Sequence, residues 1–72
     1  MYTLLTREGC HLCDNAARHL QAAGIRFLAV DINGRAELRE TYDFRVPVVL
    51  DAAGKVVAEG RIDAASARRL AR

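Results

Sequence analysis

Apolar and polar residues alternate along the chain with two different periods, near 2 in some segments and near 3.6 in others. Such a change of period predicts strands that alternate with helices. Residues Tyr2–Thr6 form a strand-like run, and residues Leu12–Ala23 follow with helical periodicity up to Gly24, a residue type that favours a helix C-terminus. One side of this predicted helix is apolar and carries Leu12, Cys13, Ala16, Ala17, Leu20 and Ala23.

The next segment, Ile25–Asp31, has an almost continuous apolar centre. This pattern predicts a strand with both faces covered. Because a helix connects it to the first strand, the two strands are expected to be parallel and to form a β-α-β unit.

A second helix is predicted after this strand, with Asn33 or Gly34 as its N-cap. Leu38 and Tyr42 are four residues apart and are expected to point into the protein, while the charged residues around them face water. Asp43 marks the end of this helix.

The last third of the sequence predicts a hairpin followed by a helix. Val46–Leu50 and Lys55–Ala58 read as its two strands, with Gly54 in the turn between them. Asp63 is expected to cap a final helix over Ala64–Ala71. The resulting order, β-α-β-α-β-β-α, predicts an α/β fold with a four-stranded mixed sheet and helices on both faces.

The composition indicates a single folded domain over residues 1–72. Hydrophobic residues make up 51% of the chain and charged residues 28%, with a formal net charge of +2, which excludes disorder. No apolar run approaches the ~20 residues that cross a bilayer, and basic residues are interspersed with acidic ones, so neither a membrane nor a nucleic acid is expected as a partner. The sequence opens on a strand-like run without a secretory signal pattern, so we expect a cytoplasmic monomer.

The only two cysteines lie in Cys10-His11-Leu12-Cys13, between the first predicted strand and the first predicted helix. The free amides and the dipole at a helix N-terminus stabilise a thiolate on Cys10, and a protonated His11 would add to this effect. Cys13 lies one turn later on the apolar side. The spacing therefore predicts dithiol–disulfide chemistry, with Cys10 as the nucleophile and Cys13 resolving the mixed disulfide.

The cysteine pair also has other interpretations. A structural zinc site needs two further ligands, and the only histidines, His11 and His19, are roughly 12 Å apart along one helix, so no metal is expected. Two alternatives stay open: a dimer that holds an iron–sulfur cluster, and a non-catalytic binding module whose cysteines are idle.

Pro47, the only proline, begins a predicted strand, a position at which a missing N–H is tolerated. If this strand runs antiparallel to the first strand, Pro47 and Gly60 lie at the edge of the sheet that carries Cys10. Asp31, at the end of the parallel second strand, belongs to the same edge.

The segment LLTREGCHLCDNA, followed by VDI and RVPVVL, resembles the glutaredoxin branch of the thioredoxin superfamily, and especially its small bacterial glutaredoxin-like domains. The resemblance covers essentially the whole chain and implies a thioredoxin-like fold. It also implies thiol–disulfide oxidoreductase activity on protein or low-molecular-weight disulfides, with glutathione as a candidate cosubstrate and no bound cofactor.

The resemblance also implies roles for individual residues. Cys10 would be the nucleophile and Cys13 its partner, while Arg7, three residues before Cys10, would help to bind glutathione. Val46 would offer backbone hydrogen bonds to the substrate, and the bond that links it to Pro47 is expected to be cis. The expected substrate-binding set is completed by His11, Leu12 and Gly60.

The chain departs from the glutaredoxin pattern at several positions. His11-Leu12 stands where glutaredoxins usually have Pro-Tyr, and Arg45 stands where they have Thr. Glu59 replaces a glycine and Ile62 an acid of the segment that holds the γ-glutamyl end of glutathione. A side chain at Glu59 blocks close backbone approach and its carboxylate repels an anion. We therefore expect peptide or protein disulfides to react faster than glutathione disulfide.

Overall fold

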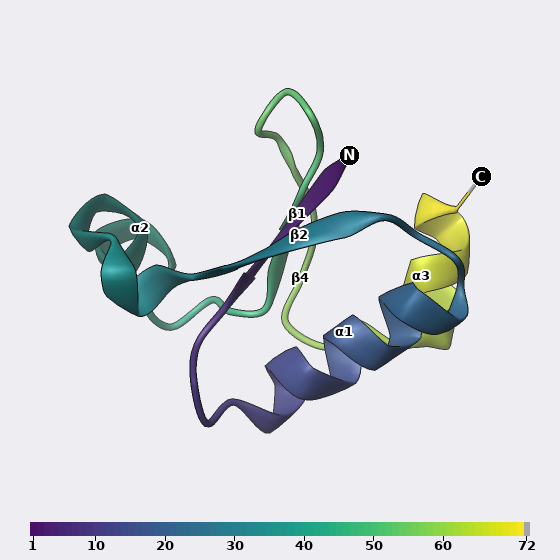
Figure 1. Ribbon diagram of the computed structural model, residues 1–72, viewed down its shortest axis with the longest axis horizontal. Helices are drawn as coiled ribbons and strands as arrows, with labels where there is room; N and C mark the ends of the chain where they lie inside the picture. Colours follow the sequence, from purple (N-terminus) through teal and green to yellow (C-terminus); the bar gives the residue numbers. More distant parts are fainter. Residues whose placement is uncertain (72) are drawn as a thin grey trace.

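The computed structural model describes residues 1–71, and within them the elements follow the predicted order β-α-β-α-β-β-α (Figure 1). Three α-helices and one 3₁₀ helix accompany four strands in this part of the chain. The elements are β1 (Tyr2–Thr6), α1 (His11–Ala22), β2 (Phe27–Asp31), η1 (Ile32–Gly34), α2 (Ala36–Tyr42), β3 (Val48–Leu50), β4 (Val56–Glu59) and α3 (Ala64–Leu70).

The four strands form one mixed sheet in the order β2-β1-β3-β4. Strands β1 and β2 are parallel, as predicted, and β3 is antiparallel to both of its neighbours. The register places Thr6 opposite Asp31 and Leu5 opposite Val48. The end of β1, the end of β2 and the start of β3 therefore meet at the same end of the sheet. We call it the Cys10 end, because the loop with Cys10 follows β1.

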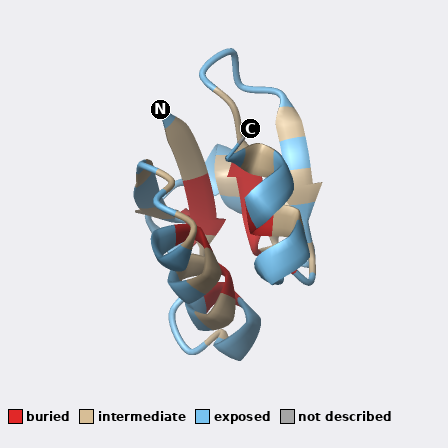
Figure 2. Ribbon diagram, turned by 90° about the vertical axis from the view of Figure 1, so that its right-hand side faces the viewer, coloured by how far each residue is buried: buried red, intermediate tan, exposed pale blue. Residues whose placement is uncertain are grey.

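The core has two layers, one on each face of the sheet. Leu4 packs in a cluster with residues of α1 and α3, whereas Leu5 packs on the opposite face in a cluster with Ile32, against which residues of α2 lie. This alternation follows from the period of two along a strand. Figure 2 shows that the buried residues gather on the central strands and on the side of α1 that faces them. The expected helices on both faces are thus confirmed.

The strand β2 differs from its prediction in length and in burial. It begins at Phe27 rather than at residue 25, and it lies at the edge of the sheet, where Leu28 is 59% exposed. The expectation that both faces of this strand are covered is therefore wrong. A run of apolar residues indicates a strand, but it does not show whether neighbouring elements extend far enough to cover it.

The start of α2 is also different from the prediction. Asp31 is the N-cap of the 3₁₀ helix η1 and not of α2. Its Oδ1 accepts a hydrogen bond from the N–H of Asn33 at 2.8 Å. The helix α2 begins only at Ala36, after Arg35, which provides no side-chain cap. Asn33 and Gly34 therefore do not cap α2, because a turn of 3₁₀ helix takes up those residues.

The hairpin strands are shorter or shifted by a residue or two. Val46 and Pro47 precede β3 rather than belonging to it, and Lys55 lies in the turn, where its N–H donates to Oδ1 of Asp51 at 2.9 Å. The predicted cap of α3 is confirmed, because Oδ1 of Asp63 accepts a hydrogen bond from the N–H of Ser66 at 2.9 Å. No helix within residues 1–71 is long and apolar enough to span a bilayer.

Candidate active site

Cys10 is the N-cap residue of α1. Its backbone is extended, and its Sγ accepts a hydrogen bond from the backbone N–H of Cys13 at 3.1 Å. The same Sγ is bonded to Sγ of Cys13 in a disulfide whose Cα atoms are 5.2 Å apart. The sulfur of Cys10 therefore lies against the free amides at the start of a helix of twelve residues.

The two cysteines differ in exposure. Cys13 is only 2% exposed and lies on the inner side of α1, whereas Cys10 is half-buried at the end of the helix. A disulfide in solution can therefore approach the sulfur of Cys10 more readily than that of Cys13.

The loop between β1 and α1 is tied to the loop that follows α2. The carbonyl of Arg7 accepts a hydrogen bond from the N–H of Cys10 at 3.3 Å. The guanidinium of Arg7 donates to the backbone carbonyl of Asp43 at 3.0 Å and forms an ion pair with its carboxylate. Arg7, to which the resemblance assigns a role in glutathione binding, thus already has Asp43 as a partner.

Pro47 lies just before β3, at the end of the sheet that carries Cys10, and is linked there to the residue after β4. Its bond to Val46 is cis, and it is fully buried. The carbonyl of Pro47 accepts a hydrogen bond from the N–H of Gly60 at 2.9 Å. The N–H of Val46 donates to the carbonyl of Tyr42 at 3.3 Å, so this donor already has a partner within the protein.

Arg45 and Glu59 form an ion pair beside Pro47. Nε and Nη2 of Arg45 donate to the two carboxylate oxygens of Glu59 at 3.0 and 2.9 Å, and the guanidinium lies 5.0 Å from the centre of the Tyr42 ring. The hydrogen bond between the two side chains is the main cause that lowers the pKa of Glu59 and raises the pKa of Arg45. The expected repulsion of anions by Glu59 is therefore reduced, because a fixed cation accompanies its carboxylate.

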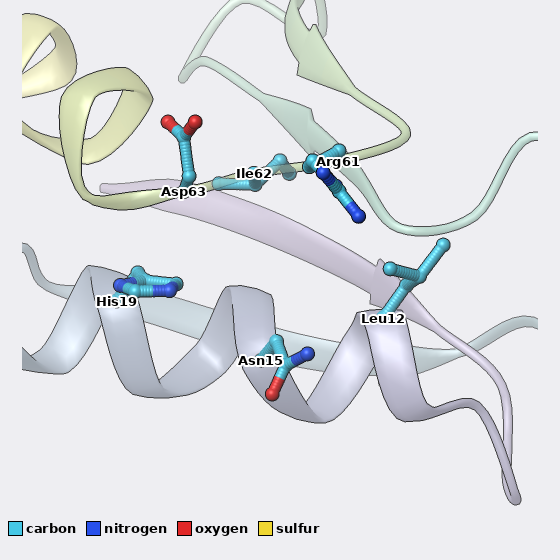
Figure 3. Close-up of a pocket in the computed structure, with 6 residues that line it drawn as sticks. All are labelled: Leu12, Asn15, His19, Arg61, Ile62 and Asp63. Carbon is cyan, nitrogen blue, oxygen red and sulfur yellow. The ribbon is translucent and has the colours of Figure 1, made fainter.

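A pocket of about 260 Å³ lies between α1 and the segment that connects β4 to α3 (Figure 3). Leu12, 43% exposed, stands at the end nearest to Cys10, and Arg61 extends toward α1 from the other side. The pKa of Asp63 is lowered by the hydrogen bonds that its carboxylate accepts from Ser66. The pocket is lined by Leu12, Asn15, His19, Arg61, Ile62 and Asp63.

The structure brings most of the expected site residues to the Cys10 end of the sheet. Arg7, Cys10 and Cys13 are linked to one another there, and Pro47 is linked to Gly60. The other expected residues lie next to these two groups in sequence. Leu12 borders the pocket, Val46 precedes the proline, and His11 is exposed at the first position of α1.

The partners that hold these residues in place are not evident from the sequence. Asp43, which binds Arg7, is expected from the sequence only as the end of a helix. Arg45 and Glu59 flank the predicted hairpin strands with opposite charges, but they do not face each other across the ladder, since Val48 is the residue opposite Glu59. Nothing in the sequence pattern indicated the contact between Arg7 and Asp43, which are 36 residues apart.

Residues 1–71 hold no group of three or more histidine, cysteine, aspartate or glutamate side chains that could bind a metal ion. Iron–sulfur clusters of the common types take four thiolate ligands. The two cysteines of one chain would therefore have to be completed by ligands from another molecule.

The fold and the cysteine pair define a thioredoxin-like domain with a C-x-x-C motif at the N-terminus of its first helix. Residues 2–70 match the family model described as Glutaredoxin-like domain (DUF836), and the chain belongs to this family. This confirms the resemblance found in the sequence.

A solved structure is also similar to this chain. It is the X-ray structure of the Northeast Structural Genomics target protein XcR50 from X. campestris, with 37% sequence identity and a TM-score of 0.86. The similarity covers 97% of this chain and 93% of that one. The comparison with curated proteins gives no match.

Proposed function

We propose that this protein is a thiol–disulfide oxidoreductase that cycles between a Cys10/Cys13 dithiol and disulfide. The observation that carries the proposal is the position of the two sulfurs. Cys10 caps α1 and is half-buried, and the buried Cys13 lies one turn away at bonding distance. A redox-active pair requires this combination of one accessible sulfur and one sheltered partner.

The reaction starts with the thiolate of Cys10 in the reduced protein. It attacks one sulfur of a substrate disulfide, a mixed disulfide forms, and the other substrate sulfur leaves as a thiolate that takes up a proton. The thiolate of Cys13 then attacks Sγ of Cys10, and the second substrate thiol is released. Two electrons pass to the substrate, and the protein is left with the Cys10–Cys13 disulfide.

The helix start supports the first step. The N–H of Cys13 donates to Sγ of Cys10 at 3.1 Å, and such a donor stabilises a thiolate more than a thiol. The positive end of the α1 dipole acts in the same direction. Protein disulfides and low-molecular-weight disulfides, glutathione disulfide among them, are the candidate substrates. The reducing cytoplasm is the compartment that suits such a dithiol.

Serine variants of the two cysteines test the proposal. With a peptide disulfide as oxidant, Cys10→Ser should lose all reaction, because the nucleophile is gone. Cys13→Ser should accumulate a covalent adduct on Cys10, because the mixed disulfide is not resolved. Mass spectrometry of the reaction mixtures reports both outcomes.

The same measurements identify a wrong assignment. If wild-type protein shows no disulfide exchange, the protein is a binding module with idle cysteines. If Cys10→Ser traps an adduct and Cys13→Ser does not, the roles of the two residues are reversed.

A further inference from the structure

Phe44 is 96% exposed, which sets it apart from the other aromatic residues of the chain. The chain has two tyrosines and two phenylalanines, and the remaining three pack against the two core clusters. An exposed large apolar side chain gains nothing for the stability of the monomer. The exposure of Phe44 therefore needs an explanation other than the stability of the monomer.

The exposure of Phe44 is fixed by its two neighbours in sequence. Asp43 is held by the guanidinium of Arg7 through its backbone carbonyl and its carboxylate. Arg45 is held by Glu59 through two hydrogen bonds, and its N–H donates to the carbonyl of Tyr42 at 2.9 Å. A turn that is fixed on both sides keeps Phe44 in water instead of letting it fold back onto the protein.

These contacts also connect the turn of Phe44 to the loop that carries Cys10. The carbonyl of Arg7 accepts a hydrogen bond from the N–H of Cys10, and the guanidinium of Arg7 holds Asp43, the residue before Phe44. Pro47, three residues after Phe44, precedes β3 at the same end of the sheet. The neighbours of Phe44 in sequence, Asp43 and Arg45, are both engaged in ion pairs, so an apolar contact at Phe44 is made beside little net charge.

The size of the exposed apolar surface around Phe44 indicates what kind of partner can cover it. A stable dimer of two copies buries more than about 1,000 Å². Phe44 and Leu12 are the exposed large apolar residues in the segments around Cys10, whereas Met1 and Leu28 lie toward the opposite end of the sheet. So small a surface suits a transient partner that must leave after electron transfer.

We infer that Phe44 is an anchor for the protein that carries the substrate disulfide, and that it packs against an apolar side chain next to that disulfide. The inference rests on the proposed function and specifies its substrate class as protein disulfides with an apolar flank. The contact with Phe44 holds the partner while Cys10 attacks. Aromatic residues, phenylalanine among them, are enriched in the buried cores of protein–protein interfaces.

Two synthetic peptides test this inference. Both contain one intramolecular disulfide, and they differ only in the residues that flank it, leucine in one and serine in the other. Wild-type dithiol should be oxidised about five- to tenfold faster by the leucine peptide. Phe44→Ala should bring the two rates to within about twofold of each other, and Phe44→Leu should restore most of the preference.

A matched control removes an exposed apolar side chain elsewhere. Leu28→Ala changes β2 at a position opposite Thr3, away from Cys10, and should keep the wild-type ratio of rates. A ratio that stays unchanged in Phe44→Ala overturns the inference, and so does an equal loss with both peptides. If wild type sediments as a dimer and Phe44→Ala as a monomer, Phe44 is a contact between copies and the inference is wrong.

The outcomes separate this inference from the proposed function. Absence of reaction between wild type and either peptide contradicts the thiol–disulfide activity itself. Reaction with both peptides at the same rate leaves the activity in place and contradicts only the role of Phe44.

Discussion

The two ends of the sheet differ in the number of contacts that join residues far apart in the sequence. At the end away from Cys10, turns are closed by neighbours in sequence. The carboxylate of Asp51 accepts hydrogen bonds from the N–H groups two and four residues later, and the N–H of Gly24 donates to the carbonyl of Gln21. The one long-range hydrogen bond of a side chain at this end joins Tyr2 to the carbonyl of Leu70 within the described residues.

At the end with Cys10, the loops are joined to one another across the sequence. Arg7 binds Asp43, Arg45 binds Glu59, and Pro47 accepts the N–H of Gly60. Each of these contacts links segments that are brought together only when the sheet has formed. The turns at one end therefore only reverse the chain, whereas the loops at the other end are held in fixed positions relative to one another.

The largest effect that tests this difference is expected from two glycines with the same backbone conformation. Gly60 lies at the Cys10 end with φ +78°, and Gly54 lies at the other end with φ +85°. A Cβ would meet no atom within 4 Å at either position, so alanine introduces backbone strain alone. Each variant should lose about 1–2 kcal/mol of unfolding free energy, measured by chemical denaturation.

The rates of oxidation by a peptide disulfide should separate the two variants. Gly60→Ala should react about tenfold more slowly than wild type, because a shift at this residue displaces the carbonyl of Pro47. Gly54→Ala should react at the wild-type rate. Equal rates in the two variants would show that the position of Gly60 is irrelevant to the reaction.

A smaller effect is expected from breaking the ion pair between Arg45 and Glu59. Glu59→Gln removes the carboxylate that pairs with Arg45 and leaves an unpaired cation at the Cys10 end of the sheet. Glutathione disulfide is an anion, so its rate should rise about three- to fivefold relative to that of uncharged hydroxyethyl disulfide, and less so at high salt. Stopped-flow oxidation of the reduced protein measures both rates.

The control for this variant is Glu40→Gln, which changes the net charge equally at an exposed position on α2. It should leave the ratio of the two rates close to that of wild type. If Glu59→Gln and Glu40→Gln change the ratio to the same extent, only the overall charge matters and the ion pair does not select the substrate.

The smallest effect concerns a local contact at the Cys10 end, the cap of α3. The pKa of Asp63 is lowered from its ordinary value of 3.8, because its carboxylate accepts hydrogen bonds from Ser66. A group whose pKa is lower in the folded state stabilises the protein above its ordinary pKa, and this contribution is lost as the pH falls through the lowered value. Acid should therefore weaken the cap.

Asn at this position keeps a capping oxygen but does not titrate. Asp63→Asn should show a shallower loss of unfolding free energy between pH 4 and pH 2 than wild type, measured by urea denaturation across this range. Curves that run parallel for the two proteins over the whole range would show that Asp63 does not contribute to the acid sensitivity.

Features that depend on neighbouring residues follow from the sequence alone. The order of the elements, the cap of α3 by Asp63 and the position of Cys10 at the start of α1 all follow from patterns within a few residues, since a helix start is set by the amides of its own first turn. The two layers of the core follow from the alternation of Leu4 and Leu5 along one strand.

Tertiary structure alone decided which separate segments meet. The edge position of β2 depends on the order of strands in the sheet, which leaves Leu28 exposed although its sequence resembles that of a covered strand. The binding of Asp43 by Arg7 and the exposure of Phe44 depend on how the loops after β1 and α2 come together at the sheet edge. Such contacts join residues that are far apart in the chain. The hydrophobic periodicity of a segment cannot predict them, because these residues become neighbours only when the sheet has folded.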